Sequence, residues 1–338
     1  MTSALLNAPG AVAGEGDEAA VAVHYGDPLR EQRLLAEGLA VVDLSHKGVV
    51  TVTGPDRLSW LDSMTTQRLV DVEPGISAES LVLSPHGHIE HSLHVLDDGV
   101  TTWLSVEPGT THALVSWLDS MRFMLRVEVA DVSEQWALLG EPIGAPSLPG
   151  EPLAWVDPWP GPVGDTAAYG PTDDHPGQDR AWRELLVPRG DLAAAVGDRP
   201  LAGTWAAEAL RVAAWRPRLG FETDHRTIPH EVDWLRTAVH LHKGCYRGQE
   251  TIARVYNLGR PPRRLVFVHL DGSDPVLPPA GAAVLVPGQE RPVGRLTSVA
   301  QHYVDGPIGL AVVKRNAPVD LDLVVDDRAA AQTVVVKP

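Results

Sequence analysis

The sequence predicts an α+β protein that ends in a small β-barrel. Up to about residue 260, strand patterns and amphipathic helix patterns follow one another as strand, helix, strands and again strand, helix, strands. That order is typical of a sheet with helices on one face. Beyond it the chain shows only short strand patterns with Pro and Gly turns, as in a small barrel. We expect a loose tail over 1–20, a body over 21–260 and a barrel domain over 261–338.

The composition is that of a soluble globular protein, since the 338 residues are 44% hydrophobic and 21% charged. Subtracting 44 acidic from 28 basic residues gives a net charge of −16. A surface of that sign repels phosphate groups, so we expect neither nucleic acid nor an anionic membrane as a partner. The first residues have no basic leader, and no run approaches the roughly 20 apolar residues that span a bilayer. We therefore expect a cytoplasmic location.

Helix boundaries in the first half of the chain are marked by capping residues. Asp27 and Pro28 are typical of an N-cap and a first helical position, and Gly38 ends that helix. Gly54 and Pro55 open a second helix, and a third covers 111–123 with its apolar residues on one face. The strand patterns of this half lie at 49–53, 80–84, 88–96, 101–106, 126–132 and 136–139.

The hexapeptide SWLDSM occurs at 59–64 and again at 116–121. One interpretation is a duplicated strand–helix unit, and the other is two similar amphipathic helices that pack on one sheet. We favour the second, because nothing outside the hexapeptide is repeated.

The second half begins with residues 141–179, which are rich in Pro and Gly and predict a long loop. A strand at 184–187, a short helix from Asp191 and an Ala-rich helix over 204–215 follow. The barrel strands are expected at 265–270, 283–286, 292–298, 308–313 and 333–336.

Cys245 is the single cysteine, which excludes an internal disulfide and a cysteine-built zinc or iron–sulfur site within one chain. It lies beside His242, Lys243 and Arg247, just ahead of a helix that we expect to begin near Gly248. Cationic neighbours and a helix N-terminus both favour the thiolate form. The sequence therefore predicts a reactive or metal-ligating thiol; the alternative is a small buried hydrophobic residue.

The octapeptide KGCYRGQE at 243–250 resembles the signature of the YgfZ family of folate-binding proteins. These are relatives of the glycine-cleavage T-protein, a tetrahydrofolate-dependent aminomethyltransferase, and act in maturing or repairing iron–sulfur enzymes. The resemblance extends over most of the chain, through segments such as 210–213, 228–231 and 293–298. It implies a T-protein-like body, tetrahydrofolate or a derivative as cofactor, and iron–sulfur client enzymes as partners.

The resemblance also implies roles for residues of the octapeptide and its continuation. Cys245 would be the essential thiol, as a nucleophile or as an iron or sulfur ligand, and Lys243 would favour its thiolate form. The residues implied to fix the loop and to contact the folate are Tyr246, Gln249, Glu250 and Arg254.

Two acidic positions of the transferase have no acidic counterpart here. The T-protein's acidic pair aligns with His91 and Ser92, while Glu90 lies one residue away, on the opposite face of a strand. Ala213 stands where the second acidic residue is expected. Whether the chain is an enzyme thus stays open, and a tetrahydrofolate-dependent aminomethyltransferase or demethylase is the alternative function.

His86, His88, Glu90 and His94 occupy alternate positions, so a regular strand would place them on one face. Such a face offers metal ligands, but alternate residues lie roughly 6–7 Å apart while ligands converge on an ion at about 2 Å. We therefore predict a polar or cavity-lining face and no metal site, with His91 as a ligand contact on the other face. His240 and His242 leave a Cys–His hydrolase as a further alternative.

Overall fold

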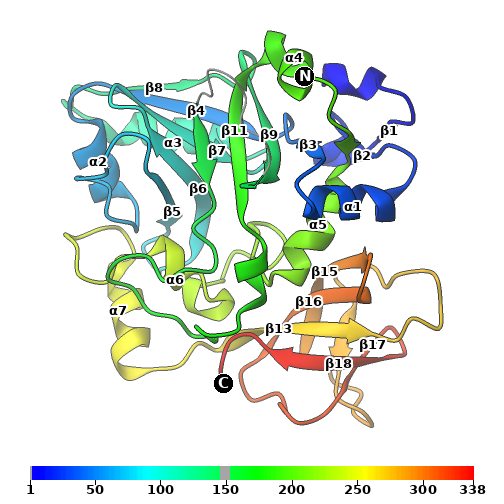
Figure 1. Cartoon of the computed structure of the whole chain (residues 1–338). Coiled ribbons are helices and arrows are strands. Elements are labelled where there is room, and N and C mark those ends of the chain that lie inside the picture. The colour runs from blue at the N-terminus through cyan, green and yellow to red at the C-terminus, as the bar shows by residue number, and fades with distance from the viewer. Residues whose placement is uncertain (1, 145–152) are drawn as a thin grey trace.

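The computed structural model describes residues 2–144 and 153–338. Its body contains two five-stranded sheets, and the C-terminal segment forms a closed barrel (Figure 1). The expected α+β fold with a C-terminal barrel is thereby confirmed. In the described ranges, no helix combines the length and apolar character needed to cross a membrane.

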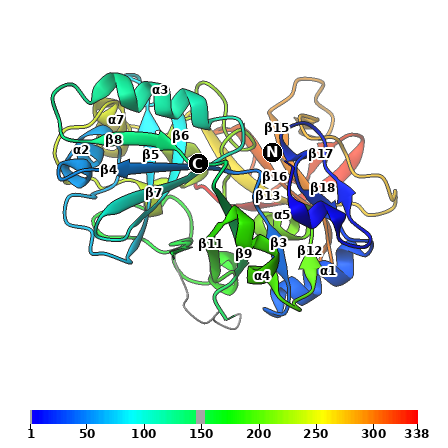
Figure 2. The same ribbon diagram turned by 90° about the horizontal axis from the view of Figure 1, so that it is seen from above.

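The first sheet has the order β5-β6-β7-β4-β8, and all its neighbours are antiparallel. Its strands are β4 (Gly48–Thr53), β5 (Ser77–Leu83), β6 (Ile89–Asp97), β7 (Thr101–Val106) and β8 (Glu128–Asp131). Helices α2 (Arg57–Met64) and α3 (Thr111–Met121) cover one face of this sheet (Figure 2). Trp60, Leu114 and Leu118 pack there in one core with strand residues such as Leu93. Both copies of the hexapeptide thus lie on helices that share one sheet face.

The second sheet has the order β10-β11-β9-β3-β12, in which only the described pair β3 and β12 is parallel. Its strands are β3 (Val41–Asp43), β9 (Trp136–Pro142), β10 (Ala154–Val156), β11 (Trp182–Pro188) and β12 (Leu201–Ala202). Val49 and Leu96 of the first sheet pack against Leu138 and Leu186 of the second. The sheets therefore meet face to face in part of the body.

Helix α5 (Thr204–Ala213) connects the body to the barrel, because it contacts α1 (Pro28–Ala36), β2 (Ala22–His24) and the barrel strand β15 (Gly294–His302). Helix α1 begins as the sequence predicts, since the Asp27 carboxylate accepts a hydrogen bond from the Arg30 backbone N–H at 3.0 Å. The remaining helices are α4 (Leu192–Val196), α6 (Leu235–Ala238) and α7 (Gln249–Leu258).

The barrel closes in the order β13-β16-β15-β14-β17-β18. Its strands are β13 (Arg263–Leu270), β14 (Ala283–Leu285), β15 (Gly294–His302), β16 (Gly306–Lys314), β17 (Leu323–Val325) and β18 (Arg328–Val334). The sequence predicted five of these six strands. It missed β17, which is three residues long and lies among aspartates, so the pattern around it is that of a turn.

Two expectations about irregular segments were wrong. The first residues are not a loose tail, because β1 (Val12–Ala13) pairs with β2 and the Leu5 side chain is buried against Val41 and Leu139. The described part of 141–179 is not only loop, since β9 extends to Pro142, β10 pairs with β11, and Trp155 and Trp159 are buried. Pro and Gly content hid these core tryptophans. The rest of that expected loop, 145–152, lies outside the described residues.

Candidate functional site

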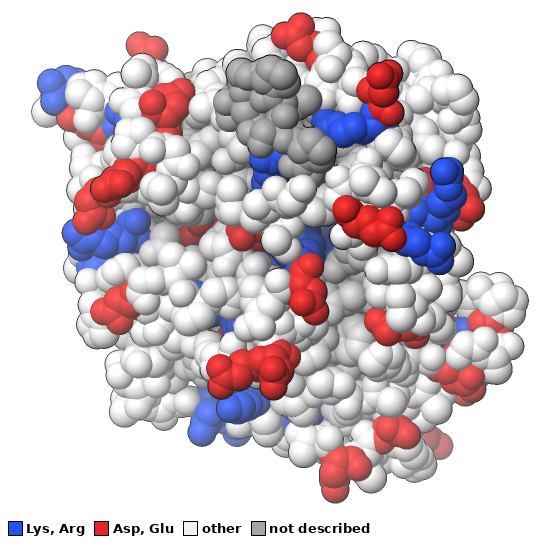
Figure 3. Space-filling model, viewed as in Figure 1, with Lys and Arg blue, Asp and Glu red and all other residues white. Residues whose placement is uncertain are grey.

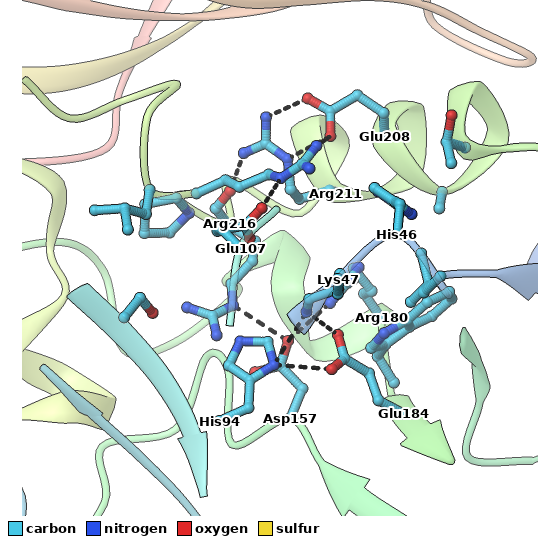
Figure 4. A pocket seen from close by; sticks show the side chains of 18 of the residues that line it. His46, Lys47, His94, Glu107, Asp157, Arg180, Glu184, Glu208, Arg211 and Arg216 are labelled. Atoms are coloured by element: carbon cyan, nitrogen blue, oxygen red, sulfur yellow. Dashed lines mark hydrogen bonds and ion pairs between the residues drawn. The ribbon is translucent and has the colours of Figure 1, made fainter. Parts of the chain in front are cut away.

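A charged cavity of about 680 Å³, including its open mouth, lies between β6, β11, α5 and the loop that follows α5 (Figure 4). Its cations are Lys47, Arg180, Arg211, Arg216 and Arg218. Its carboxylates are Glu18, Glu107, Asp157, Glu184 and Glu208. On the outer face in Figure 3, acidic and basic side chains are interspersed rather than gathered. In the cavity, by contrast, five cationic and five carboxylate side chains line one space.

One wall of the cavity is a network around Glu184, which β11 places among Leu185, Leu186 and other apolar residues. The Lys47 ammonium donates to Glu184 Oε1 at 2.7 Å, and His94 Nδ1 lies 3.0 Å from Oε2. Ser105 Oγ donates to the same Oε2 at 3.0 Å. Burial raises the pKa of the Glu184 carboxyl, but the Lys47 charge and these hydrogen bonds outweigh it and hold the pKa well below its usual range. Glu184 is thus a buried carboxylate.

A second wall is built around Asp157 and Arg216. Arg216 donates through Nε to Asp157 at 3.2 Å and through Nη2 to Glu79 at 2.5 Å, and Arg180 Nη1 donates to Asp157 at 2.9 Å. Burial opposes the charge on Asp157, but Arg216 and Arg180 lower the pKa of its carboxyl. Arg216 Nη1 and Arg180 Nε are buried donors that have no partner among the described residues. Since buried donors are seldom left unpaired, these two are suited to a ligand's acceptor atoms.

Helix α5 supplies the wall nearest the barrel. Arg211 Nε donates to Glu208 at 2.8 Å, and Arg211 Nη2 donates to Ser298 Oγ of β15 at 2.6 Å. Arg218 Nε donates to Glu107 at 2.9 Å. Burial raises the pKa of the Glu208 carboxyl, yet Arg211 outweighs that effect and lowers it to about 2. This wall is therefore charged at neutral pH and tied to the barrel.

Aromatic and uncharged polar groups complete the lining. Trp182 and Trp234 both line the cavity, and Trp234 Nε1 donates to Glu79 at 2.8 Å. Burial lowers the pKa of His46 to about 4, so this side chain is neutral at pH 7. With indole rings, buried guanidinium donors and carboxylate acceptors, the cavity can hold a flat, polar heterocycle.

The structure places Cys245 on the surface, in the segment between α6 and α7. The thiol is accessible, as the sequence predicts, but Cys245 is not one of the residues that line the charged cavity. Tyr246 follows it and is buried in the core cluster that also contains Trp234. The thiol segment therefore reaches the core through Tyr246, while Cys245 itself lies on the surface.

The three cations that neighbour Cys245 in the sequence each have a partner other than the thiol. The Lys243 ammonium donates to the backbone carbonyls of Asp62, Thr65 and Gln67 at the end of α2, and its side chain is 1% exposed. Three carbonyls satisfy all three of its donors. Lys243 therefore anchors α2 to the thiol segment. Arg247 pairs with Glu90 at 2.9 Å, and His242 pairs with Asp165.

The residues predicted to contact the folate do not line the cavity. Tyr246 is a core residue whose pKa is raised by burial. Gln249 begins α7, and Glu250 and Arg254 form an exposed ion pair four residues apart on that helix. Tyr246 thus lies in the core, Glu250 and Arg254 lie on the outer surface, and Gln249 is half-buried.

The alternating residues of β6 do not share one face, because a β-bulge interrupts the strand. Val82 pairs with His91 while Leu83 pairs with Ile89, so Glu90 is the extra residue. As a result Ser92 and His94 line the cavity and Glu90 meets Arg247 outside it. His91 is buried, and burial lowers its pKa to about 4, but it does not line the cavity. No group of three or more His, Cys, Asp or Glu in the described residues is placed to hold a metal ion.

The sequence did not identify most of the cavity residues, because they come from segments far apart in the chain. Lys47 and Glu184, for example, are 137 positions apart. The available signal was a charged residue within a strand that otherwise reads as buried, as Glu184 does in WRELLVP. Ala213, the second position where an acidic residue was expected, packs against the core and does not line the cavity.

Comparison with known proteins agrees with this architecture. The family model of the GCVT N-terminal domain matches residues 3–140. A chloroplastic protein of Arabidopsis thaliana, whose name describes it as a transferase, is 29% identical over 311 residues, which cover 83% of this chain and 66% of that protein, just under two thirds. An aminomethyltransferase of Symbiobacterium thermophilum is 27% identical, and the match covers 82% of this chain and 78% of that protein.

Two further similarities bear on fold and family. A mitochondrial protein of Cryptococcus neoformans, named as a homologue of the iron–sulfur cluster assembly factor IBA57, is 26% identical. The match covers 68% of this chain and 66% of that protein. The crystal structure of aminomethyltransferase T of the Bartonella henselae glycine cleavage system superposes with a TM-score of 0.75 at 19% identity, covering 99% of this chain and 95% of that one. The chain therefore has the aminomethyltransferase fold, its residues 3–140 match the GCVT N-terminal domain model, and it is similar to aminomethyltransferases and to an IBA57 homologue.

Proposed function

We propose that the charged cavity binds tetrahydrofolate or a derivative, and that the protein acts in the assembly, maintenance or repair of iron–sulfur enzymes. The observation that carries the proposal is the set of unpaired buried donors, Arg216 Nη1 and Arg180 Nε, in a cavity lined by Trp182 and Trp234. A reduced pterin is a flat ring that presents a carbonyl oxygen, acceptor nitrogens and N–H donors. The guanidinium donors suit its acceptors, and the carboxylates of Glu184 and Glu208 suit its N–H groups.

The lining is better suited to a pterin than to a purely apolar ligand. Arg216 and Glu79 are buried together with Asp157, at 4%, 0% and 8% exposure. Buried charges are costly unless paired, and apolar replacement of such a group is often neutral or stabilising. A binding role for the charged lining gives a reason to retain it. A bound folate would supply the one-carbon carrier chemistry of its ring nitrogens, while this chain's residues bind and orient that ring.

The iron–sulfur part of the proposal is supported by the similarity to the IBA57 homologue and by the accessible Cys245 thiol. One thiol cannot hold a cluster by itself, because clusters require about four protein ligands. We infer that Cys245 acts together with thiols of a second protein or a small thiol, as a nucleophile or as an iron or sulfur ligand. Because Cys245 is exposed and does not line the cavity, we propose it as a separate surface site.

Cells that lack the chain and express Cys245→Ala test this role. We expect the activities of their iron–sulfur enzymes, such as radical methylthiolases, to remain as low as without the chain. The control is Ser63→Ala, which removes an exposed hydroxyl on the body surface and should restore these activities. Undiminished activity with Cys245→Ala would remove the role given to the thiol.

Aminomethyltransferase or demethylase activity is the second candidate, and the aminomethyltransferase-like homologues favour it. Its weakness is that Ser92, rather than a carboxylate, lines the cavity at the aligned position. Incubation of the purified protein with tetrahydrofolate and a methylamine-type substrate separates the two functions. Turnover supports the transferase, and tight folate binding without turnover supports the accessory function.

A further inference from the structure

His94 has one ring nitrogen committed to protein and one free. Nδ1 lies 3.0 Å from Glu184 Oε2 and 3.4 Å from Lys47 Nζ. The shorter contact is to a carboxylate with a lowered pKa, and two acceptors do not approach to 3.0 Å, so Nδ1 carries the proton and donates to Glu184. Lys47 directs its own short hydrogen bond to the other oxygen of Glu184 at 2.7 Å.

The opposite nitrogen, Nε2, makes no hydrogen bond with any described residue, and the His94 ring lines the cavity beside Glu184 and Lys47 (Figure 4). With its proton on Nδ1, a neutral imidazole has a lone pair on Nε2. His94 therefore offers the cavity a hydrogen-bond acceptor, in contrast to the guanidinium groups on the neighbouring walls.

The ring is held in a fixed orientation. It stacks on Trp155 with a centroid distance of 3.7 Å and an angle of 6° between the planes. Trp155 is 1% exposed, and its Nε1 donates to the Ala78 carbonyl at 2.8 Å. A stacked ring with one nitrogen bound to a carboxylate cannot turn to exchange its two nitrogens without breaking both contacts.

We propose that His94 Nε2 is a specificity-determining acceptor that selects ligands with a ring N–H, and that Glu184 is the residue that positions it. This inference rests on the proposed folate site and defines the ligand further. A tetrahydropterin has hydrogen on both nitrogens of its reduced ring, whereas the fully oxidised pterin of folic acid has only lone pairs there. If a ring nitrogen of the oxidised pterin faces His94 Nε2, two acceptors oppose each other and no hydrogen bond forms. The site therefore selects the reduced cofactor, whose ring N–H can donate to Nε2.

The other groups around His94 keep their charge state near neutral pH. Asp157, from the segment after β10, and Glu107, from the segment after β7, are carboxyls with lowered pKa values. Arg216, from the loop after α5, has a raised pKa, and the pKa of His46 is about 4. Lys47, which precedes β4, and Glu184 of β11 form the ion pair described above. Changes in the charge of these neighbours therefore do not alter the surroundings of His94 Nε2 near pH 7.

The experiment compares the dissociation constants of tetrahydrofolate and folic acid for the whole chain at pH 7.5, followed by tryptophan fluorescence. For the unaltered protein we expect tetrahydrofolate to bind about tenfold or more tightly than folic acid, since an unpaired buried acceptor has a cost of that order. His94→Phe should remove this preference. His86→Gln, on the exposed turn before β6, should keep it.

Glu184→Gln tests the positioning role. We expect a reduced preference and, in nitrogen-15 spectra of the imidazole, a loss of the single Nδ1–H tautomer at His94; a purely structural role would leave the tautomer unchanged. The same spectra show the tautomer of His94 in the folded fraction, so the test also holds if Glu184→Gln lowers the stability of the protein. A preference that survives in His94→Phe, or equal binding of the two folates by the unaltered protein, would overturn the inference. Binding of neither folate would instead overturn the proposed function.

Discussion

His230 is a buried histidine whose side chain has 0% exposure and lies edge-on to Tyr169, with ring centroids 5.3 Å apart. Burial lowers its pKa from 6.5 to about 4, against a small opposing effect of the Ile252 backbone. The unfolded chain therefore binds a proton at this side chain between pH 6.5 and pH 4, whereas the folded chain does not. Stability contributed by the neutral ring is complete above pH 6.5 and is lost as the pH falls toward 4.

His230→Leu should make the pH dependence of stability shallower. In that window, the free energy of unfolding of the unaltered protein should fall more steeply with decreasing pH than that of the variant, by up to about 1.4 kcal/mol per pH unit. Urea denaturation at several pH values measures both slopes. The exposed His112 provides the control, since His112→Leu should leave the slope unchanged. Equal slopes for His230→Leu and the unaltered protein would contradict the effect.

Single residues show where sequence reasoning succeeded and where it failed. The accessibility of Cys245 was predicted correctly, because a polar segment with Gly on both sides favours a surface loop. The hydrogen-bond partners of Lys243 were not predicted, because they lie far away in the sequence; the Asp62 carbonyl, for example, is 181 positions away. Local sequence gives the charge of a side chain, but its partner depends on the tertiary fold.

At the level of elements, the repeated hexapeptide provides a matched pair of tryptophans. Trp60 of α2 is 2% exposed, whereas Trp117 of α3 is only partly buried, under the guanidinium group of Arg247 at 5.7 Å. Trp60→Ala should cost about 3–5 kcal/mol of unfolding free energy because it opens a cavity in the core. Trp117→Ala should cost clearly less. Chemical denaturation of both variants measures the difference, and equal losses would show that the two helices are packed equivalently.

Gly248 determines how closely α7 approaches the turn between β5 and β6. Gly248 has a φ of +81°, and a Cβ there would lie 2.6 Å from the Ser84 carbonyl oxygen. In Gly248→Ala, the left-handed backbone alone should lower the free energy of unfolding by about 1–3 kcal/mol. The clash of the new Cβ with the Ser84 carbonyl should lower it further. Gly244, four residues earlier, has open space around it. Gly244→Ala should be nearly neutral in the same denaturation experiment, and a loss as large as that of Gly248→Ala would contradict this account.

Elements with strong periodicity were predicted well, and their exceptions have physical causes. The cap at Asp27 and the apolar face of α3 were visible in the sequence, because local hydrogen bonding and helical spacing determine them. The bulge at Glu90 was not, because a single extra residue leaves the alternation of β6 unchanged in the sequence while it reverses the face. For that reason His94 was placed correctly on a polar face and Glu90 was not.

At the scale of the whole molecule, the charged cavity depends on several parts of the chain at once. Glu184 comes from the second sheet, His94 from the first, and Arg211 from a helix tied to the barrel through Ser298. No local motif records this arrangement, so the sequence predicted a folate ligand from a resemblance but not the residues that would hold it. The segment that carries the resemblance instead presents a surface thiol that is not among the residues lining the cavity.

Titration of the protein with tetrahydrofolate tests the central claim, that the cavity between the sheets is the folate site. Ala207 of α5 lines this cavity without bearing charge, so Ala207→Phe fills it and leaves the ion pairs intact. We expect saturable binding, followed by tryptophan fluorescence, that is weakened about tenfold or more in Ala207→Phe and is unchanged in Cys245→Ala. Undiminished affinity in Ala207→Phe, or loss of binding in Cys245→Ala, would contradict the account and place the folate at the thiol segment instead.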